Sequence, residues 1–235
     1  MPDDPQNHVT LKMQDDVAVI TLDDGKANAL SHDMLQAATS ALDEAAEARA
    51  VVLAGRPGRF CAGFDLSIMT RGMDAAQDLV KAGAGVLLRL FTLPAPLVIA
   101  ATGHAMAGGA VLLLTGDHCV GPEGEFKIGL NEVAIGMPLP IFAVELARFR
   151  LGAKHFAAAT SLARIYDPKG ALEAGYLHEL APPDDLLDLA LERARALAAT
   201  LKPRAFARTK EQARGAIARH VAETMDEDLS NFTVG

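Results

Sequence analysis

The segment GHAMAGGAVLLL, residues Gly103–Leu114, joins a glycine pair to an uninterrupted apolar run. If Ala110–Leu114 is helical, Gly108 and Gly109 lie in its first turn, where backbone N–H groups lack intrahelical acceptors. The helix dipole adds partial positive charge there, and the missing side chains let a ligand oxygen approach the backbone. The segment therefore predicts a site for an anion or oxyanion that is built from main-chain amides.

A second candidate donor lies in the segment RFCAGFDL, residues 59–66, which follows an expected strand and a Gly/Pro turn. Gly63 permits a sharp bend, so the N–H of Phe64 can point outward at the start of a helix. Each of these segments follows a buried strand. Two outward amides, those of Phe64 and Gly108, are the smallest set of donors that can form an oxyanion hole. For either segment alone, a tight turn or close packing is the better interpretation, but their joint occurrence favours the oxyanion hole.

The elements that must position these amides alternate between strands and helices. We expect Val9–Met13 and Val17–Leu22 to form a hairpin, and Ser31 to cap a helix that runs to about Arg49. This alternation is typical of α/β proteins with largely buried strands. The apolar patterns further predict strands at Ala50–Ala54, Leu97–Ala101 and His118–Val120, helices at Asp74–Leu93 and Ala110–Leu114, and an extended piece at Glu125–Ile128.

From Leu139 onward the apolar spacing becomes helical, and only a short strand at His178–Leu180 is suggested there. The last helices are expected over Asp184–Leu201 and Pro203–Val221. We therefore expect an α/β core over residues 1–175 and a helical C-terminal region over residues 176–235.

Composition argues against several classes of function. The net charge of −8, with acids spread along the chain, gives no basic footprint for nucleic acid or an anionic membrane. No apolar stretch is long enough for a membrane span, and the polar start MPDDPQNHVT does not resemble a signal peptide. Two cysteines suggest a reducing compartment, so a cytoplasmic protein is expected. No His/Cys cluster has metal-ligand spacing, so no metal is expected.

Four pieces of the chain together resemble the crotonase, or enoyl-CoA hydratase/isomerase, superfamily. They are LDDGKANALS at 22–31, AGFDL at 62–66, GHAMAGG at 103–109 and GLNEVAIGM at 129–137, in matching order and separation. The resemblance covers roughly residues 9–220. It implies a right-handed spiral of ββα units with a C-terminal helical region that helps to form trimers, which often pair into hexamers.

The resemblance also implies an acyl-CoA thioester as the substrate, with coenzyme A entering as part of it and no separate cofactor. The amides of Phe64 and Gly108 would hold the thioester oxygen as it becomes enolate-like, and each such donor can contribute about 3 kcal/mol. The CoA-binding surface would include Lys26, Ala27, Ala29, Ala62, Asp65 and Lys210.

Two of these positions have a second interpretation. Asp65 directly follows a donor amide, where it also suits the cap of the next helix. Lys210 matches a position that often meets the CoA phosphate, and a solvated helix lysine is the alternative.

Of the two positions that usually supply acid–base chemistry in the family, one matches Glu132 and the other holds Val111. The family's hydratases divide water addition between two glutamates, and a valine can neither hydrogen-bond nor transfer a proton. Moving a double bond from a 3-enoyl to a 2-enoyl thioester needs only one base. The flanking Val133, Ile135 and Met137 are expected to raise the pKa of that base.

We therefore expect an enzyme, most simply a 3,2-enoyl-CoA isomerase that uses Glu132. One alternative is an enoyl-CoA hydratase or related lyase in which another acid replaces the missing glutamate. A third, of a different class, is an acyl-CoA-binding protein without catalysis, for which Glu132→Gln would change neither phenotype nor CoA-ester affinity.

Overall fold

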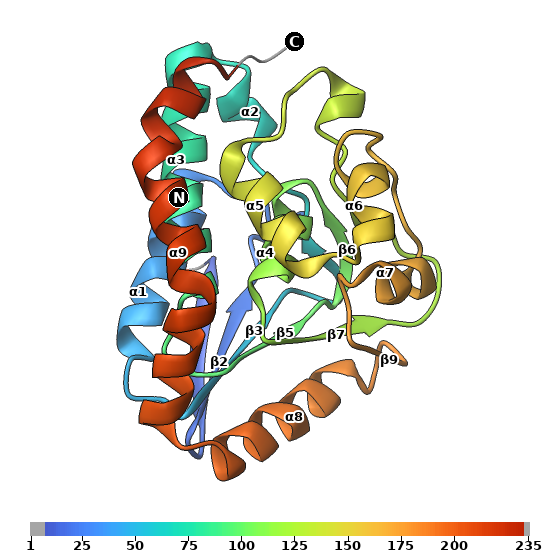
Figure 1. Ribbon diagram of the computed structural model, residues 1–235. Coiled ribbons are helices and arrows are strands. Elements are labelled where there is room, and N and C mark those ends of the chain that lie inside the picture. The colour runs from blue at the N-terminus through green and yellow to red at the C-terminus, as the bar shows by residue number, and fades with distance from the viewer. Residues whose placement is uncertain (1–7, 233–235) are drawn as a thin grey trace, which may run out of the picture.

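Two β-sheets organise the chain in the computed structural model, which describes residues 8–232 (Figure 1). The larger sheet has the strand order β1-β2-β3-β5-β7-β9 and the smaller one β4-β6-β8. Only the β1–β2 pair is antiparallel among the strand pairs of this described part. The strands are β1 (Val9–Gln14), β2 (Val17–Leu22), β3 (Ala50–Ala54), β4 (Gly58–Cys61), β5 (Leu97–Ala100), β6 (Gly103–Met106), β7 (His118–Pro122), β8 (Ile128–Gly129) and β9 (Glu179–Ala181).

The middle of the chain repeats one unit, in which a strand of the larger sheet is followed by a strand of the smaller sheet and then by helix. β3 and β4 lead to α2 (Leu66–Met69) and α3 (Met73–Phe91), and β5 and β6 lead to α4 (Gly108–Thr115). The ββα units implied by the resemblance are thus confirmed. Because β4 and β6 pair in parallel, the two segments that carry the expected donor amides leave the smaller sheet at the same end.

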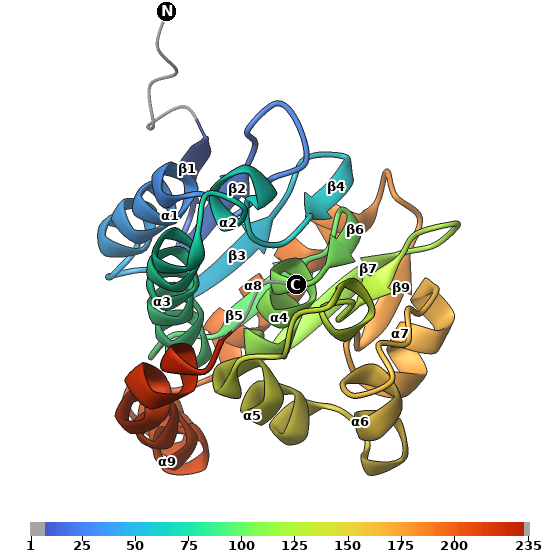
Figure 2. The same ribbon diagram turned by 90° about the horizontal axis from the view of Figure 1, so that it is seen from above.

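The larger sheet separates two apolar cores. One face is covered by α1 (His32–Glu44), α3 and α4, and the other by α8 (Leu186–Thr200) (Figure 1). Covering on both faces explains why the residues of β3 are all apolar, since each of them is buried. Every residue of α4 is buried as well, which accounts for the apolar run after the glycine pair. Seen from above, α4 lies in the middle with α3 and α5 (Ile141–Arg150) beside it (Figure 2).

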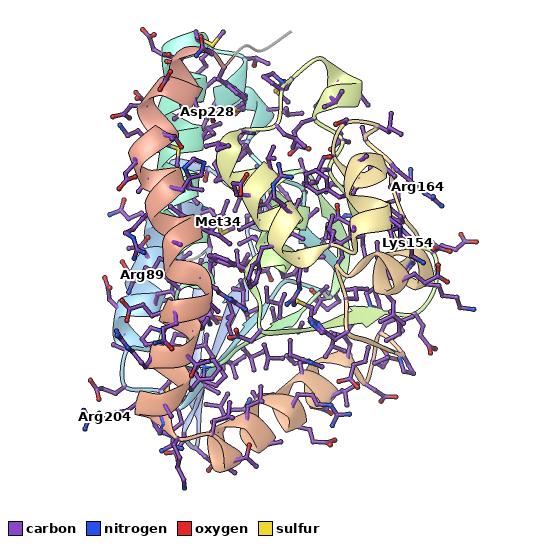
Figure 3. The ribbon with its side chains drawn as sticks, viewed as in Figure 1. Met34, Arg89, Lys154, Arg164, Arg204 and Asp228 are labelled. Atoms are coloured by element: carbon purple, nitrogen blue, oxygen red, sulfur yellow. The ribbon has the colours of Figure 1, made fainter. Side chains whose placement is uncertain are left out.

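The C-terminal half is helical, with α6 (Ala153–Ala159), α7 (Pro168–Ala174), α8 and α9 (Pro203–Ser230). α9 runs along α3 and α5 (Figure 1). Near its end, Asp228 accepts a 2.9 Å hydrogen bond from the N–H of Ile141, the first residue of α5 (Figure 3). The suggested strand near residue 180 is confirmed as β9, at an edge of the larger sheet.

The ends of α1 and α9 differ from expectation by more than a helical turn. Ser31 caps α1 as predicted, accepting from the N–H of Met34 at 3.2 Å, but the helix ends at Glu44 rather than near Arg49. The guanidinium of Arg49 instead donates to carbonyls at the C-terminal end of α8, at 2.6 and 3.1 Å. α9 continues past Val221 to Ser230, because Met225 and Leu229 extend the same buried stripe at intervals of four.

Within residues 8–232, no helix is both long and apolar enough to cross a bilayer.

Candidate active site

The two predicted donor segments meet where β4 and β6 end. Gly63 has φ +93°, and a Cβ placed on it would lie 3.1 Å from the amide nitrogen of Gly108. Leu30 N–H donates to the carbonyl of Gly63 at 2.8 Å, and Asp65 N–H donates to the carbonyl of Leu30 at 3.2 Å. These two bonds engage the carbonyl of Gly63 and the N–H of Asp65, the residues on either side of Phe64. The N–H of Phe64 itself therefore points away from Leu30. Among residues 8–232, no acceptor is hydrogen-bonded to the amide of Phe64 or of Gly108.

The backbone before Gly108 is held in a conformation that L-residues rarely adopt. Ala107 has φ 51° and ψ −126°, and its N–H donates to the carbonyl of Gly129 at 2.9 Å. Strain of this kind costs on the order of 1–3 kcal/mol and is common at functional sites. The conformation of Ala107 turns the chain from β6 into α4, so that the first N–H of the helix is that of Gly108.

The two glycines of the pair serve different purposes. A Cβ on Gly109 would lie 2.1 Å from the carbonyl oxygen of Cys61, so this residue permits α4 to pack against β4. Close packing is therefore the correct interpretation for Gly109, whereas Gly108 presents its free amide. Burial raises the pKa of the Cys61 thiol to about 12, which leaves it unreactive at neutral pH.

Glu132 lies just after β8, at the start of the 3₁₀ turn η2 (Val133–Ile135). Its carbonyl accepts hydrogen bonds from Ile135 and Met137, both at 3.0 Å, which fixes this turn. The residue is only 8% exposed, and its Oε2 has no hydrogen-bond partner among the described residues. Burial raises the pKa of Glu132 to about 7, against a smaller lowering by the backbone amides of Glu132 and Asn131.

Phe64 and Glu132 line the same pocket, which has a volume of about 230 Å³. Its wall also includes Val111 and Met137, and the other lining residues are apolar except for Asn131. Among residues 8–232, Glu132 is the only ionisable side chain in this wall. Of the flanking residues expected to surround it, Ile135 and Met137 line the pocket. Val133 does not, and it is 44% exposed.

The loop predicted to bind CoA is tied to the donor segment by a residue that sequence reasoning did not single out. Asn28 is fully buried with φ 53°, and its Nδ2 donates to the carbonyls of Leu22, Arg59 and Phe60 at 2.9–3.1 Å. Asparagine adopts positive φ more readily than most residues, so an asparagine in this loop was the one sequence signal for its role. Ala62 N–H donates to the carbonyl of Ala27 at 3.0 Å, so Lys26, Ala27, Ala29 and Ala62 belong to adjoining segments.

Of the predicted site residues, Phe64, Glu132 and Ala62 line the pocket. The others do not line it: Lys26, Ala27, Ala29, Asp65, Gly108 and Lys210. Asp65 caps α2, accepting from the N–H of Ser67 at 2.8 Å. The Lys210 side chain is buried, and its Nζ lies 2.6 Å from Oδ2 of Asp117. Its interpretation as a solvated lysine was therefore wrong. Asp117 follows the C-terminal end of α4, about 12 Å of helix away from Gly108.

Within the described part of the chain, no three His, Cys, Asp or Glu side chains are arranged to hold a metal ion.

In this spiral of ββα units two free amides lie close together, and the residue of one of them, Phe64, lines an apolar pocket together with one buried carboxyl. This arrangement defines a crotonase-like α/β protein. The chain belongs to the enoyl-CoA hydratase/isomerase family, whose family model matches residues 12–234. It is an enoyl-CoA isomerase or hydratase of the crotonase superfamily, and the family implies an acyl-CoA substrate.

Solved structures of similar proteins carry both activities in their names. An enoyl-CoA hydratase/isomerase family protein from Pseudomonas syringae is 36% identical with a TM-score of 0.94, over 98% of this chain and 100% of that one. An enoyl-CoA isomerase from Mycobacterium tuberculosis is 38% identical with a TM-score of 0.91, over 96% and 99%. An enoyl-CoA hydratase from Mycobacterium marinum is 37% identical with a TM-score of 0.90, over 96% and 100%.

Proposed function

We propose that the chain is a 3,2-enoyl-CoA isomerase in which Glu132 is the only acid–base group. The observation that carries this proposal is the composition of the pocket wall, where Glu132 is the sole ionisable side chain among residues 8–232. Val111 occupies the position of a second glutamate and is 1% exposed. One carboxyl suffices to move a double bond, whereas water addition in the family's hydratases uses two.

In the proposed reaction the Glu132 carboxylate removes a proton from C2 of the 3-enoyl thioester. The electron pair of the C2–H bond moves toward the thioester oxygen, which the N–H groups of Phe64 and Gly108 stabilise as a dienolate. Glu132 then returns the proton to C4, and the double bond settles between C2 and C3. A pKa of about 7 suits both steps, because the group must accept a proton and release it with similar ease.

The two alternative functions place different requirements on the pocket. A hydratase needs a second acid, and Glu123 and Glu125, which precede β8, are exposed and absent from the pocket wall. A binding-only protein has no use for a buried carboxyl with an unpartnered oxygen, which costs stability.

The direct test of isomerisation is incubation of trans-3-hexenoyl-CoA with the protein, followed by chromatography of the thioesters. We expect conversion to trans-2-hexenoyl-CoA at a rate proportional to enzyme concentration. Tight binding of the thioester with no conversion would support the binding-only protein instead.

The pH dependence of isomerisation should report the ionisation of Glu132. Because the base must be ionised to accept the C2 proton, kcat/KM should rise about tenfold per pH unit below pH 7 and level off above it. Initial rates from pH 5 to 9 measure this profile. A plateau that extends down to pH 5 would mean that the essential base has an ordinary carboxyl pKa and is not the buried Glu132.

Gly83 should matter for catalysis although it lies on α3, because the ring of Phe64 rests on it. A Cβ on Gly83 would lie 2.3 Å from Cε1 of that ring. Gly83→Ala should therefore push the ring of Phe64 aside and shift its N–H, with a loss in kcat of up to about 10²-fold, as for a misplaced catalytic group.

Gly85→Ala on the same helix is the matched control, since a Cβ there meets nothing within 4 Å. It should keep full activity and raise stability by up to about 1 kcal/mol through helix propensity. Steady-state kinetics and thermal unfolding of both variants separate the two effects, and equal activities would refute the positioning of Phe64 by Gly83.

Three further proposals remain, of which the first two rest on the family resemblance and the third on the composition of the chain. Lys26, Ala27, Ala29 and Ala62 form part of the CoA-binding surface, with Lys26 exposed to solvent. The C-terminal region, residues 176–235, contributes to a homotrimer or a dimer of trimers. The location in the cell is cytoplasmic.

A further inference from the structure

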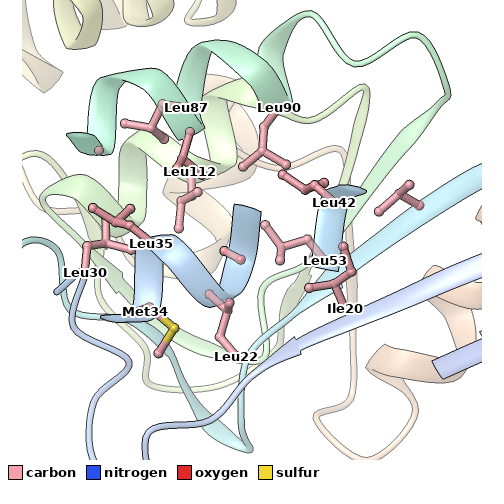
Figure 4. Close-up of a pocket in the computed structure, with 14 residues that line it drawn as sticks. Ile20, Leu22, Leu30, Met34, Leu35, Leu42, Leu53, Leu87, Leu90 and Leu112 are labelled. Atoms are coloured by element: carbon pink, nitrogen blue, oxygen red, sulfur yellow. The ribbon is translucent and has the colours of Figure 1, made fainter. Parts of the chain in front are cut away.

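An apolar cavity lies between α1, α3, α4 and the larger sheet (Figure 4). Its volume is about 20 Å³, and all of its lining residues are apolar or glycine. Leu35, Leu53 and Leu112 are among those that surround it in Figure 4. Cavities lined only by such groups stay dry and accept apolar guests.

This cavity adjoins the active-site pocket along two helices. On α3, Val80 lines the pocket, and Gly83, about one turn further on, lines the cavity. On α4, Val111 lines the pocket and its neighbour Leu112 lines the cavity. The same two helices therefore form walls of both spaces.

The ring of Phe64 stands at the boundary. Its tip rests on α3, where a Cβ on Gly83 would lie 2.3 Å from Cε1 and 2.6 Å from Cζ. At its other end, a Cβ on Gly108 would lie 3.4 Å from Cδ2 of the ring and 3.2 Å from Cδ1 of Leu30. Leu30 lines the cavity, and Phe64 lines the pocket.

We propose that the side chain of Phe64 sets the depth of the acyl pocket and thereby limits the length of acyl chain that the enzyme accepts. The inference deepens the proposed function, on which it rests. The ring closes the route from the pocket to the cavity. If the ring were absent, the alkyl tail of a long acyl-CoA would enter the space that the ring vacates together with the cavity behind it. This role belongs to the side chain, whereas the proposed catalytic role of the same residue belongs to its backbone N–H.

The ratio of kcat/KM for trans-3-dodecenoyl-CoA to that for trans-3-hexenoyl-CoA tests the proposal, because a general loss of activity cancels in it. Phe64→Ala should raise this ratio at least about tenfold over the wild type, since each newly buried methylene contributes roughly fourfold. Ala38→Leu in the Phe64→Ala background should return the ratio toward the wild-type value. Ala38 lines the cavity and not the pocket, so the larger side chain fills the space that the tail would use.

Met69→Ala is the matched control, because Met69 lines the pocket but not the cavity. It should change the ratio far less than Phe64→Ala does. The proposal is overturned if Phe64→Ala leaves the ratio unchanged, if Met69→Ala raises it equally, or if Ala38→Leu fails to reverse the gain in a protein that thermal unfolding shows to be folded.

Calorimetric affinities for hexanoyl-CoA and dodecanoyl-CoA separate this proposal from the isomerase assignment, because saturated thioesters bind without reaction. The affinity ratio should change between the wild type and Phe64→Ala in the same direction as the kinetic ratio. If this affinity ratio changes but neither 3-enoyl-CoA is isomerised, the role of Phe64 as the limit on chain length is supported. Only the assignment as an isomerase is then refuted.

Discussion

Glu132→Gln is expected to lower the turnover of a 3-enoyl-CoA by about 10²–10⁴-fold, the usual contribution of a positioned acid–base group. The amide has nearly the shape of the carboxyl but cannot accept the C2 proton. Because Glu132 faces an apolar pocket and does not belong to the proposed CoA-binding surface, the affinity for the thioester should change little. Single-turnover kinetics and calorimetry with the same substrate measure both quantities.

Stability provides the control for this variant. The pKa of Glu132 is raised to about 7 by burial, so the folded protein binds a proton that the unfolded chain releases near pH 4.5. The stabilisation that comes with this proton is therefore complete below pH 4.5 and is lost as the pH rises through 7. Relative to the wild type, Glu132→Gln should gain up to about 3 kcal/mol in free energy of unfolding at pH 8. Full turnover by this more stable variant would contradict the role of Glu132.

Asp117→Asn should lower the free energy of unfolding by about 3–5 kcal/mol, because it removes the counter-charge of two buried cations. Asp117 lies 2.6 Å from Lys210 and 2.8 Å from Arg214, and both cations are buried on α9. Arg214 also donates to the carbonyls of Phe91 and Thr115 at 2.9 and 3.0 Å, which ties α9 to α3 and α4. Urea unfolding at pH 7 measures the loss.

The matched control for this loss is Asp226→Asn. Asp226 pairs with Lys81 between α9 and α3, but its side chain is 82% exposed. Exposed ion pairs contribute little, so this variant should unfold almost as the wild type does. Equal losses from the two substitutions would show that burial does not distinguish the Asp117 cluster.

The parts of the site that are built from backbone were predictable from sequence. Gly63 and Gly108 permit conformations and close approaches that few other residues allow, and a short, wholly apolar strand precedes each of the two segments that carry them. The order of strands and helices therefore indicated two amides that act together, although β4 and β6, the strands that carry them, were not among those expected. Val111 was equally informative about the reaction. The sequence itself shows that this position, where the family's hydratases have a second glutamate, lacks a carboxyl group.

The parts that depend on distant packing were not predictable. Lys210 has the sequence context of an exposed helix residue, and only the docking of α9 buries it against Asp117, 93 residues away. The contact of Gly83 with the ring of Phe64 likewise joins two segments whose relation the local pattern does not contain. Asn28 was the intermediate case, since its positive φ has a sequence preference but its three acceptors lie on β2 and β4.

The most direct test of Glu132 as the single acid–base group is the product distribution from one enzyme and two substrates. Trans-3-hexenoyl-CoA and trans-2-hexenoyl-CoA would each be incubated with the wild type, and the thioesters followed by NMR. We predict that the 3-enoyl substrate becomes the 2-enoyl thioester, and that 3-hydroxyhexanoyl-CoA forms from neither at more than the uncatalysed rate. Formation of 3-hydroxyhexanoyl-CoA from the 2-enoyl thioester as fast as isomerisation would contradict this role, because a second acid would then have to act beside Glu132.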